Sequence, residues 1–475
     1  MPQAISASRL AGLLGDFDRS PAYAGLADAL ALLVGDGRIG RDVRLPSERD
    51  LTSALGVSRT TVTRAYAVLR EHGYAHARHG SGTFTRIPGG RAQALDRVLR
   101  PHADGDVLTD LTVAAGKAPA GLATLYAEAV SDLPVYLGGH GYFPTGLPAL
   151  QSTVAEHYRA RGLPTDPDQI LITSGALSAI AVVLHTVVSP GERVALESPT
   201  YPNASEAVRT RGARPVALPV EPTDWDIAAM AETLHQTQPR LAYLVPDFQN
   251  PTGHLMDDAQ RAQLAHALRS AGTVALVDET LWPLALDGQR MPRPLAAHAD
   301  GAITVGSTSK AFWGGLRLGW IRAPHRWVEP LTRTRVSLDL GAPVLEQLVA
   351  HRLLGAEQIL AERRRLLRAQ RDAVVTATAE LLPEWRLTLP GGGLSLWIEL
   401  PTRAASRLAA AATRRGVAVT PGPAFAVEGG MDSFLRLPFA HPADELREAV
   451  GRLAVTWEAV RAGSAAGRRP RVVLA

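Results

Sequence analysis

The chain has 475 residues, of which 46% are hydrophobic and 20% charged, and its formal net charge is +4. This length predicts about two or three domains, because one ordinary core does not extend so far. The chain has no cysteine, which excludes disulfides, thiolate zinc sites and cysteine nucleophiles. With so small a net charge, any surface that binds nucleic acid must be a local basic patch. No signal peptide and no apolar run of ~18 residues occurs, so we expect a cytoplasmic protein without a membrane partner.

Residues 1–20 are expected to form a short N-terminal arm with a weak amphipathic turn around Leu10 and Leu14. Residues 21–86 have the pattern of a DNA-binding module. Ser47 is placed to cap a helix that ends at Gly56, and Ser58 caps a second helix. Two short helices joined by a tight glycine turn predict a helix-turn-helix. The next segment, residues 76–86, predicts a β-hairpin wing with Gly80 at its tip.

The second helix presents the candidate DNA contacts. Its first turns carry side chains that reach phosphates, guanine edges or thymine methyl groups in a major groove, namely Ser58, Arg59, Thr60, Thr61 and Arg64. Residues 21–90 contain nine Arg against six Asp and Glu, a local charge of +3. The alternative is a helical module that only packs, but the turn, the caps and the wing together favour DNA binding.

Residues 87–108 are expected to be a linker rich in glycine and proline. From residue 109 onward, strand-length apolar runs alternate with helical patterns, which predicts a mostly parallel α/β sheet covered on both faces. The expected strands are residues 170–173, 193–196, 215–218, 241–245, 273–277, 302–305 and 318–321. The expected helices include residues 224–235 and 258–270. Residues 109–475 form one domain in this interpretation, with a smaller α+β subdomain from about residue 340.

Polar residues follow the predicted strands one after another, at the sheet edge where ligands gather. They are Ser174, Gly175 and Ala176, then Tyr201, Asn250 and Asp278, and then Ser307, Ser309, Lys310 and Arg317. Lys310 is one of only two lysines in the chain. Unlike arginine, a lysine can lose its proton and form a Schiff base with a carbonyl. Each residue alone has an ordinary structural explanation, but the set in this order predicts a site for an aldehyde cofactor with a phosphate group.

Two resemblances extend this interpretation. Residues 21–86 resemble the winged helix-turn-helix of the GntR family of bacterial regulators, through L-P-S-E-R-D-L, G-V-S-R-T-T-V and H-G-S-G-T-F. This resemblance implies DNA contacts by Arg49, Arg59, Thr61 and Gly80. Residues 110–460 resemble fold type I aminotransferases, through S-G-A, S-P-T-Y-P, N-P-T-G, V-D-E-T and S-T-S-K-A-F-W-G-G-L-R-L-G-W.

The second resemblance implies pyridoxal 5'-phosphate as cofactor and a role for each matching residue. Lys310 would form the Schiff base, Asp278 would pair with the ring nitrogen, and Asn250 would bond the 3-oxygen. Tyr201 would stack on the ring, Arg436 would bind a carboxylate of the amino compound, and Tyr142 would reach the phosphate of the partner subunit. The phosphate itself would be bound by Ser174, Gly175, Ala176, Ser307, Ser309 and Arg317. The chain departs from the family where a second tyrosine is usual, since D-E-T-L-W supplies Thr280 and Leu281.

A GntR-type module joined to an aminotransferase-like domain is the pattern of the MocR family. That resemblance implies a transcription regulator that binds operator DNA as a head-to-tail, domain-swapped homodimer and senses an amino compound or pyridoxal phosphate itself. Such a regulator would be associated with the nucleoid when it is bound to DNA. The alternatives are a working aminotransferase that carries a DNA-binding module, and a repressor with a degenerate cofactor site. Thr280 and Leu281 argue against efficient turnover, and the intact Lys310 and Asp278 argue against a degenerate site.

Overall fold

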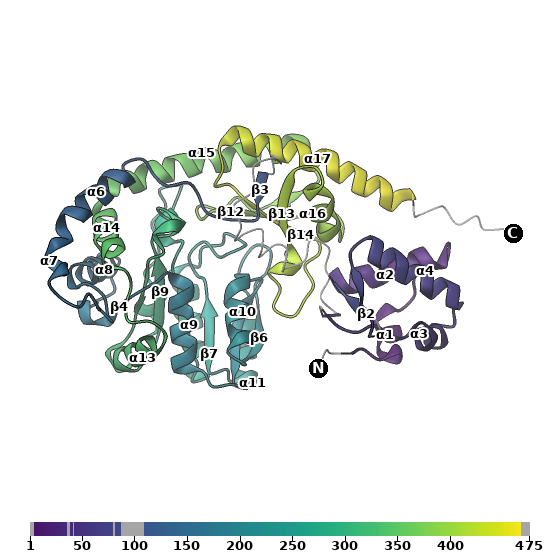
Figure 1. Cartoon of the computed structure of the whole chain (residues 1–475), viewed down its shortest axis with the longest axis horizontal. Helices are drawn as coiled ribbons and strands as arrows, with labels where there is room; N and C mark the ends of the chain where they lie inside the picture. Colours follow the sequence, from purple (N-terminus) through teal and green to yellow (C-terminus); the bar gives the residue numbers. More distant parts are fainter. Residues whose placement is uncertain (1–3, 36–38, 41, 79–80, 87–108, 467–475) are drawn as a thin grey trace.

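A computed structural model of the chain describes residues 4–35, 39–40, 42–78, 81–86 and 109–466 (Figure 1). The predicted linker at residues 87–108, the predicted DNA contact Gly80 and the arginine-rich tail after residue 466 lie outside the described residues. No described helix has the length and apolar character needed to cross a membrane.

The N-terminal part is a winged helix-turn-helix, as predicted. Its elements are α1 (Ala7–Leu14), α2 (Ala22–Gly35), α3 (Glu48–Leu55), α4 (Arg59–Glu71), β1 (Ala75–Arg78) and β2 (Gly82–Thr85). Both predicted caps form, because Ser47 accepts a hydrogen bond from Asp50 N and Ser58 accepts one from Thr61 N. Gly56 ends α3 with a φ of 63°, a left-handed conformation that favours glycine. The antiparallel pair β1–β2 is the wing.

The N-terminal arm is part of this unit's core, which the sequence pattern did not predict. Leu10 and Leu14 of α1 are buried in the same apolar cluster as Leu26 and Leu51. A short amphipathic helix gains little stability alone, so its packing against α2 and α3 explains why it forms.

The aminotransferase-like part is built on a seven-stranded sheet in the order β4-β10-β9-β8-β7-β5-β6. The strands are β4 (Ile170–Thr173), β5 (Arg193–Ser198), β6 (Arg214–Pro219), β7 (Leu241–Leu244), β8 (Val274–Asp278), β9 (Ile303–Ser307) and β10 (Gly319–Arg322). β10 is antiparallel to its neighbours, and the pairs of β5 to β9 are parallel. All seven predicted strands are present, each within about two residues of its predicted bounds.

Helices cover both faces of this sheet, as the near-continuous apolar strands require (Figure 1). One face packs on α8 (Pro148–Ala160), α11 (Ile227–Thr237) and α12 (Asp258–Ser270). The other packs on α9 (Ala176–Val187), α10 (Pro202–Thr210) and α13 (His325–Leu338). Outside these layers lie α6 (Leu122–Asp132), α7 (Pro134–Leu137) and α14 (Val344–Gly355).

The small domain is a five-stranded sheet in the order β11-β12-β14-β13-β3, packed on long helices (Figure 1). Its elements are β11 (Arg386–Leu387), β12 (Ser395–Glu399), β13 (Val417–Pro421), β14 (Phe434–Pro438), α15 (Glu357–Leu381), α16 (Ala405–Thr413) and α17 (Ala443–Ala466). β3 (Thr109–Leu111) pairs in parallel with β13, although the chain reaches it before the large sheet begins. This pairing, which the sequence pattern did not predict, brings residues 112–116 to the ligand site.

Candidate functional site

Lys310 lies in the turn that follows β9, directly beyond the carboxyl end of that strand. Ser307 Oγ donates to the carbonyl of Leu318 at 3.1 Å and accepts from Ser309 N at 3.0 Å, which fixes the turn. Lys310 Nζ donates to the carbonyl of Ala114 at 2.9 Å. Burial, followed by the positive charge of Arg436, lowers the pKa of Lys310 to about 8. The amine is therefore neutral far more often near neutral pH than an exposed lysine is, as a Schiff-base lysine requires.

A cradle for an anion lies beside Lys310, where the chain passes from β4 into α9. Gly175 has a φ of 100°, and a Cβ built on it would lie 3.1 Å from Arg317 Nη2. Arg317 itself is held at a φ of 47° and donates to the carbonyl of Ser174 at 3.3 Å. A non-glycine residue at positive φ is strained, and such strain is common at ligand sites. Backbone N–H groups at the start of α9 and the Arg317 guanidinium thus surround space that only glycine leaves open, which fits a phosphate.

Asp278 is buried at the end of β8, and two donors hold its carboxylate. Tyr243 Oη donates to Oδ2 at 2.7 Å, and the backbone N–H of Thr280 donates to Oδ1 at 2.9 Å. Burial and then the Asp278 charge raise the pKa of Tyr243 well above its usual range, so this phenol remains a donor. Sequence reasoning missed Tyr243, whose only local signal is a hydroxyl in an otherwise apolar strand.

Arg436 comes from β14 of the small domain and reaches the same site. Its Nη2 donates to the carbonyl of Thr112, and its Nη1 donates to Asn250 Oδ1 at 3.3 Å. Its Nε is buried and makes no hydrogen bond within the described part of the chain. Burial lowers the pKa of Arg436 to about 10, so the group is still a cation at neutral pH. A buried guanidinium with a free donor fits an incoming carboxylate.

Tyr201 lies at the start of α10, where its hydroxyl accepts from Asn203 at 2.9 Å. Burial raises the pKa of Tyr201, and the charges of Asp278, Arg436 and Arg317 all act on it. The loop before it is anchored by Gln249, which donates to the carbonyl of Pro199 at 2.7 Å. The structure therefore gathers Tyr201, Asn250, Asp278, Lys310, Arg317 and Arg436 at one site.

Tyr142 is also predicted to bind the cofactor. Within the single chain, no described contact connects it to this site. This residue is 57% exposed, and its ring stacks on His140. The structure agrees with the sequence that residues 280–281 provide no second tyrosine at the site. Thr280 contributes its backbone N–H to Asp278, and Leu281 is buried in an apolar cluster that includes residues of both domains, so neither supplies a phenol.

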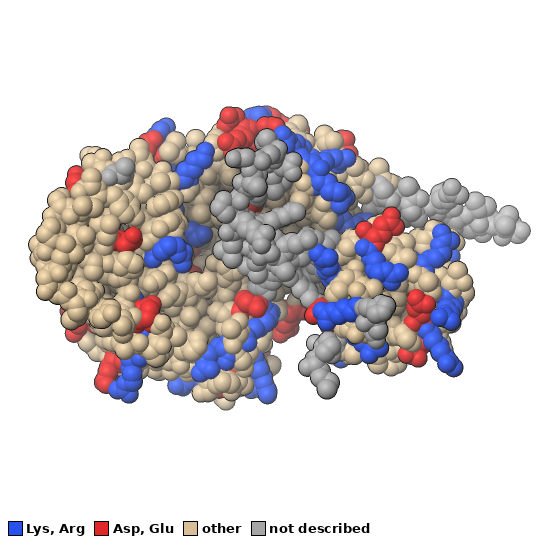
Figure 2. All heavy atoms as spheres, in the orientation of Figure 1, with Lys and Arg blue, Asp and Glu red and all other residues tan. Residues whose placement is uncertain are grey.

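The DNA-binding candidates lie on α3 and α4 at one end of the winged helix, where Figure 2 shows several basic side chains. Arg59 is 78% exposed and lies 3.7 Å from Glu48, and Arg49 and Thr60 are exposed as well. Ser58 and Thr61 are engaged with each other at 2.8 Å as part of the cap. The guanidinium of Arg64 lies over the ring of a tyrosine on α2, 4.1 Å from its centroid.

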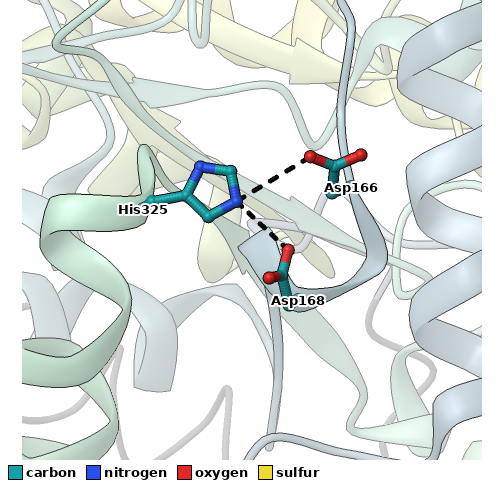
Figure 3. A group of neighbouring side chains, drawn as sticks. All are labelled: Asp166, Asp168 and His325. Carbon is teal, nitrogen blue, oxygen red and sulfur yellow. Dashed lines mark hydrogen bonds and ion pairs between the residues drawn. The ribbon is translucent and has the colours of Figure 1, made fainter.

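A group of acidic and histidine side chains lies on the surface of the large domain (Figure 3). His325 Nε2 is 3.3 Å from Asp168 Oδ1 and 3.8 Å from Asp166 Oδ2. All three residues are exposed, and they join a short 3-10 helix (Pro167–Gln169) to the start of α13. We interpret the group as a surface ion pair.

Comparison with known proteins agrees with both parts of this description. Residues 22–85 match the family of bacterial regulatory proteins called gntR, and residues 137–453 match aminotransferase class I and II. An uncharacterized HTH-type transcriptional regulator, YdcR of Escherichia coli, is 27% identical over 453 residues, which cover 90% of this chain and 96% of the relative. The probable rhizopine catabolism regulatory protein MocR of Rhizobium meliloti is 27% identical over 336 residues, covering 66% and 67% of the two chains.

Among solved structures, an α-aminoadipate aminotransferase, LysN of Thermus thermophilus in complex with N-(5'-phosphopyridoxyl)-L-leucine, is similar with a TM-score of 0.70 and 30% identity. The match covers 78% of this chain and 96% of that one. The chain belongs to the aminotransferase class I and II family, and its N-terminal GntR module gives it the architecture of a MocR-type transcription regulator. Pyridoxal 5'-phosphate is the standard cofactor of the aminotransferase family.

Proposed function

We propose that this regulator binds pyridoxal 5'-phosphate through Lys310 and that an amino compound, or the cofactor itself, changes how it binds operator DNA. The observation that carries this proposal is the position of Lys310. Its amine has a lowered pKa and interacts electrostatically with Asp278, Arg317 and Arg436. A lysine that served only solubility would be exposed and would have its ordinary pKa.

Each neighbour has a definite task toward the cofactor. When bound, pyridoxal phosphate supplies an aldehyde that reacts with amines and a ring that withdraws electrons. Asp278, oriented by Tyr243, would accept from the ring nitrogen and keep it protonated. Asn250 would donate its amide N–H to the ring oxygen, and the Tyr201 ring would stack on the cofactor ring. The backbone at Ser174, Gly175 and Ala176, the turn at Ser307 and Ser309, and Arg317 would hold the phosphate.

The effector would be an amine that competes with Lys310 for the aldehyde, and Arg436 would bind any carboxylate that it carries. Arg436 lies on β14, and it also bonds the carbonyl of Thr112, next to β3. The segment that leads from the winged helix enters this domain at β3. A ligand that engages Arg436 therefore acts on the strand to which the DNA-binding module is tethered, and it shifts the balance between two domain arrangements.

We further propose that the active form is a head-to-tail homodimer in which each winged helix lies over the partner. Large apolar side chains are exposed on the segment that precedes Tyr142, including Val135 at 82% and Leu137 at 69%, and exposed apolar side chains of this size support an interface. Tyr142 would then contribute to the phosphate site of the partner subunit.

The test is spectroscopic. The purified protein with pyridoxal phosphate should show a near-ultraviolet or visible band that Lys310→Ala abolishes, and operator binding should depend on the cofactor or on an added amine. A protein that binds no cofactor, or whose operator affinity ignores both, overturns the proposal. An assay of amino-group transfer from an amino acid to a keto acid distinguishes the aminotransferase alternative from this proposal. We expect no efficient turnover in that assay, because residues 280–281 lack the tyrosine.

A further inference from the structure

Glu197 is a buried carboxylate near the carboxyl end of β5, and the proposed function gives it no task. Its Oε1 accepts from Trp225 Nε1 at 3.0 Å. Its Oε2 accepts from the backbone N–H of Val245 at 3.2 Å and from Gln249 Nε2 at 3.1 Å. Burial of a carboxylate is costly unless donors surround it, and three donors from separate parts of the chain do so. Glu197 therefore connects β5 to the loop that follows β7.

Gln249 extends this connection toward the ligand site. Its Nε2 also donates to the carbonyl of Pro199 at 2.7 Å. Its Oε1 accepts from the backbone N–H of Thr252 at 3.0 Å and from the hydroxyl of Thr252 at 2.9 Å. With the bond to Glu197, the amide makes four hydrogen bonds, which is all that a glutamine side chain can make. Because Pro199, Thr252 and Gln249 are buried, the orientation of this amide is fixed.

Asn250 follows Gln249 in the same turn and reaches the ligand site. The backbone closes the turn, because Gly253 N–H donates to the carbonyl of Gln249 at 2.6 Å and Gln249 N–H donates to the carbonyl of His254 at 2.8 Å. Asn250 is half-buried, and its Oδ1 accepts from Arg436 at 3.3 Å. Its amide nitrogen therefore carries the donors for a ligand. The direction of these donors depends on how Gln249 is held.

We propose that Glu197 is a positioning residue for the cofactor. Through Gln249, it sets the direction in which Asn250 presents its amide to the ring oxygen of pyridoxal phosphate. The alternative is that Glu197 only stabilises the fold. This inference rests on the proposed function, since it assumes that the cofactor binds and that Asn250 meets its ring oxygen.

The first test is Glu197→Gln, which keeps the shape of the side chain. The change removes the charge and replaces one acceptor oxygen by an N–H2 group that faces other donors, so the connection to Gln249 weakens. Absorbance titration of the full-length protein should show a roughly tenfold loss of affinity for pyridoxal phosphate. The absorbance band should shift in the same direction as in Asn250→Ala, because both changes alter the donor at the ring oxygen.

The pH of these titrations is set by the acid itself. Burial raises the pKa of Glu197 to about 7, although its three donors act in the opposite direction. A protonated carboxyl would bring a further donor into a group of donors. The titrations are therefore run at about pH 8.5, where Glu197 is mostly ionised.

A double-mutant cycle with Asn250→Ala separates positioning from stability. Once residue 250 lacks its amide, Glu197→Gln should change the cofactor affinity by less than about twofold and leave the band in place. It should still lower the melting temperature, because the buried donors lose their acceptor. A loss of affinity that is equally large in both backgrounds overturns the inference.

Gln249→Ala cuts the same connection without altering Glu197, so it should reproduce the loss and the band shift. It replaces Glu197→Gln in the cycle if that variant does not fold. Gln169→Ala is the control. Gln169 is also buried, donates to the carbonyl of Ala323 at 3.0 Å and accepts from Asp166 N at 2.9 Å, but it precedes β4 at the opposite edge of the sheet. It should lower the melting temperature only, and an equal loss of cofactor affinity in both alanine variants would contradict the inference.

Failure of the inference is distinguishable from failure of the proposed function. If the unaltered protein shows no cofactor band, the proposed function fails, and the inference fails with it. If Lys310→Ala abolishes the band as expected, but neither Glu197→Gln nor Gln249→Ala weakens cofactor binding, only the inference fails.

Discussion

The phenol of Tyr243 donates a 2.7 Å hydrogen bond to Asp278, and both side chains are buried at the carboxyl ends of neighbouring strands. Tyr243 thus fixes the direction of the carboxylate that we assign to the ring nitrogen. We predict that Tyr243→Phe leaves one carboxylate oxygen without its donor, destabilises the fold by about 1–3 kcal/mol and weakens cofactor binding. Urea unfolding and absorbance titration measure the two effects.

A matched control for this change is Tyr66→Phe in the winged helix. Tyr66 is also buried, and its hydroxyl donates to the carbonyl of Pro46 at 2.9 Å. Its loss should cost similar stability in the winged helix and leave cofactor affinity unchanged. If Tyr243→Phe binds the cofactor as tightly as the unaltered protein, Tyr243 does not position Asp278.

The pKa of Lys310 predicts how the rate of cofactor capture depends on pH. The neutral amine is the nucleophile, and the pKa is lowered to about 8. Below pH 8 the amine is increasingly protonated, so the rate should fall about tenfold for each pH unit, and above pH 8 it should level off. Stopped-flow absorbance after mixing with pyridoxal phosphate gives the profile.

Arg436→Gln tests how much the charge of Arg436 contributes to the lowered pKa of Lys310. Removing that positive charge relieves repulsion on the protonated amine, so the inflection should move to higher pH. An inflection that stays in place would mean that the charge of Arg436 does not contribute to the lowered pKa of Lys310.

Gly175→Ala should damage the anion cradle. The added methyl group would lie 3.1 Å from Arg317 Nη2 and would require a φ of 100°. We expect the affinity for pyridoxal phosphate to fall by at least about tenfold, and the affinity for pyridoxal, which lacks the phosphate, to fall less.

Gly191→Ala is the control, because Gly191 has a φ of 87° but no atom within 4 Å of the added Cβ. It introduces comparable backbone strain outside the cradle. Equal losses of cofactor affinity in the two variants would show that strain, rather than the cradle, explains the effect.

Arg59 begins α4 with a side chain that is 78% exposed, so we expect it to contact DNA. Arg59→Ala should weaken specific binding by about 1–3 kcal/mol. Arg70→Ala, an exposed arginine in the last turn of the same helix, should have a small effect. Gel-shift titrations against fragments that the unaltered protein selects from a random duplex library measure both, and equal losses would contradict a contact by the first turn.

Local patterns were sufficient for most of the fold. The strands of the large sheet, the caps at Ser47 and Ser58, and the left-handed turn at Gly56 follow from spacing and turn chemistry, which act over a few residues. The sequence pattern does not predict β3, because three residues form no recognisable pattern and the partner strand of β3 is distant in sequence. The sequence of α1 predicts only a weak amphipathic arm, because the stability of this helix comes from packing against α2 and α3.

The sequence by itself determined which chemical groups are available: a rare lysine after β9, an aspartate after β8, a glycine and an arginine suited to an anion. It also determined that a DNA-binding module precedes them. Only the tertiary structure decided how those groups are held, through Tyr243 under Asp278 and through residues 112–116 along Lys310. The physical reason is that burial and missing partners depend on distant segments, which local sequence patterns do not specify.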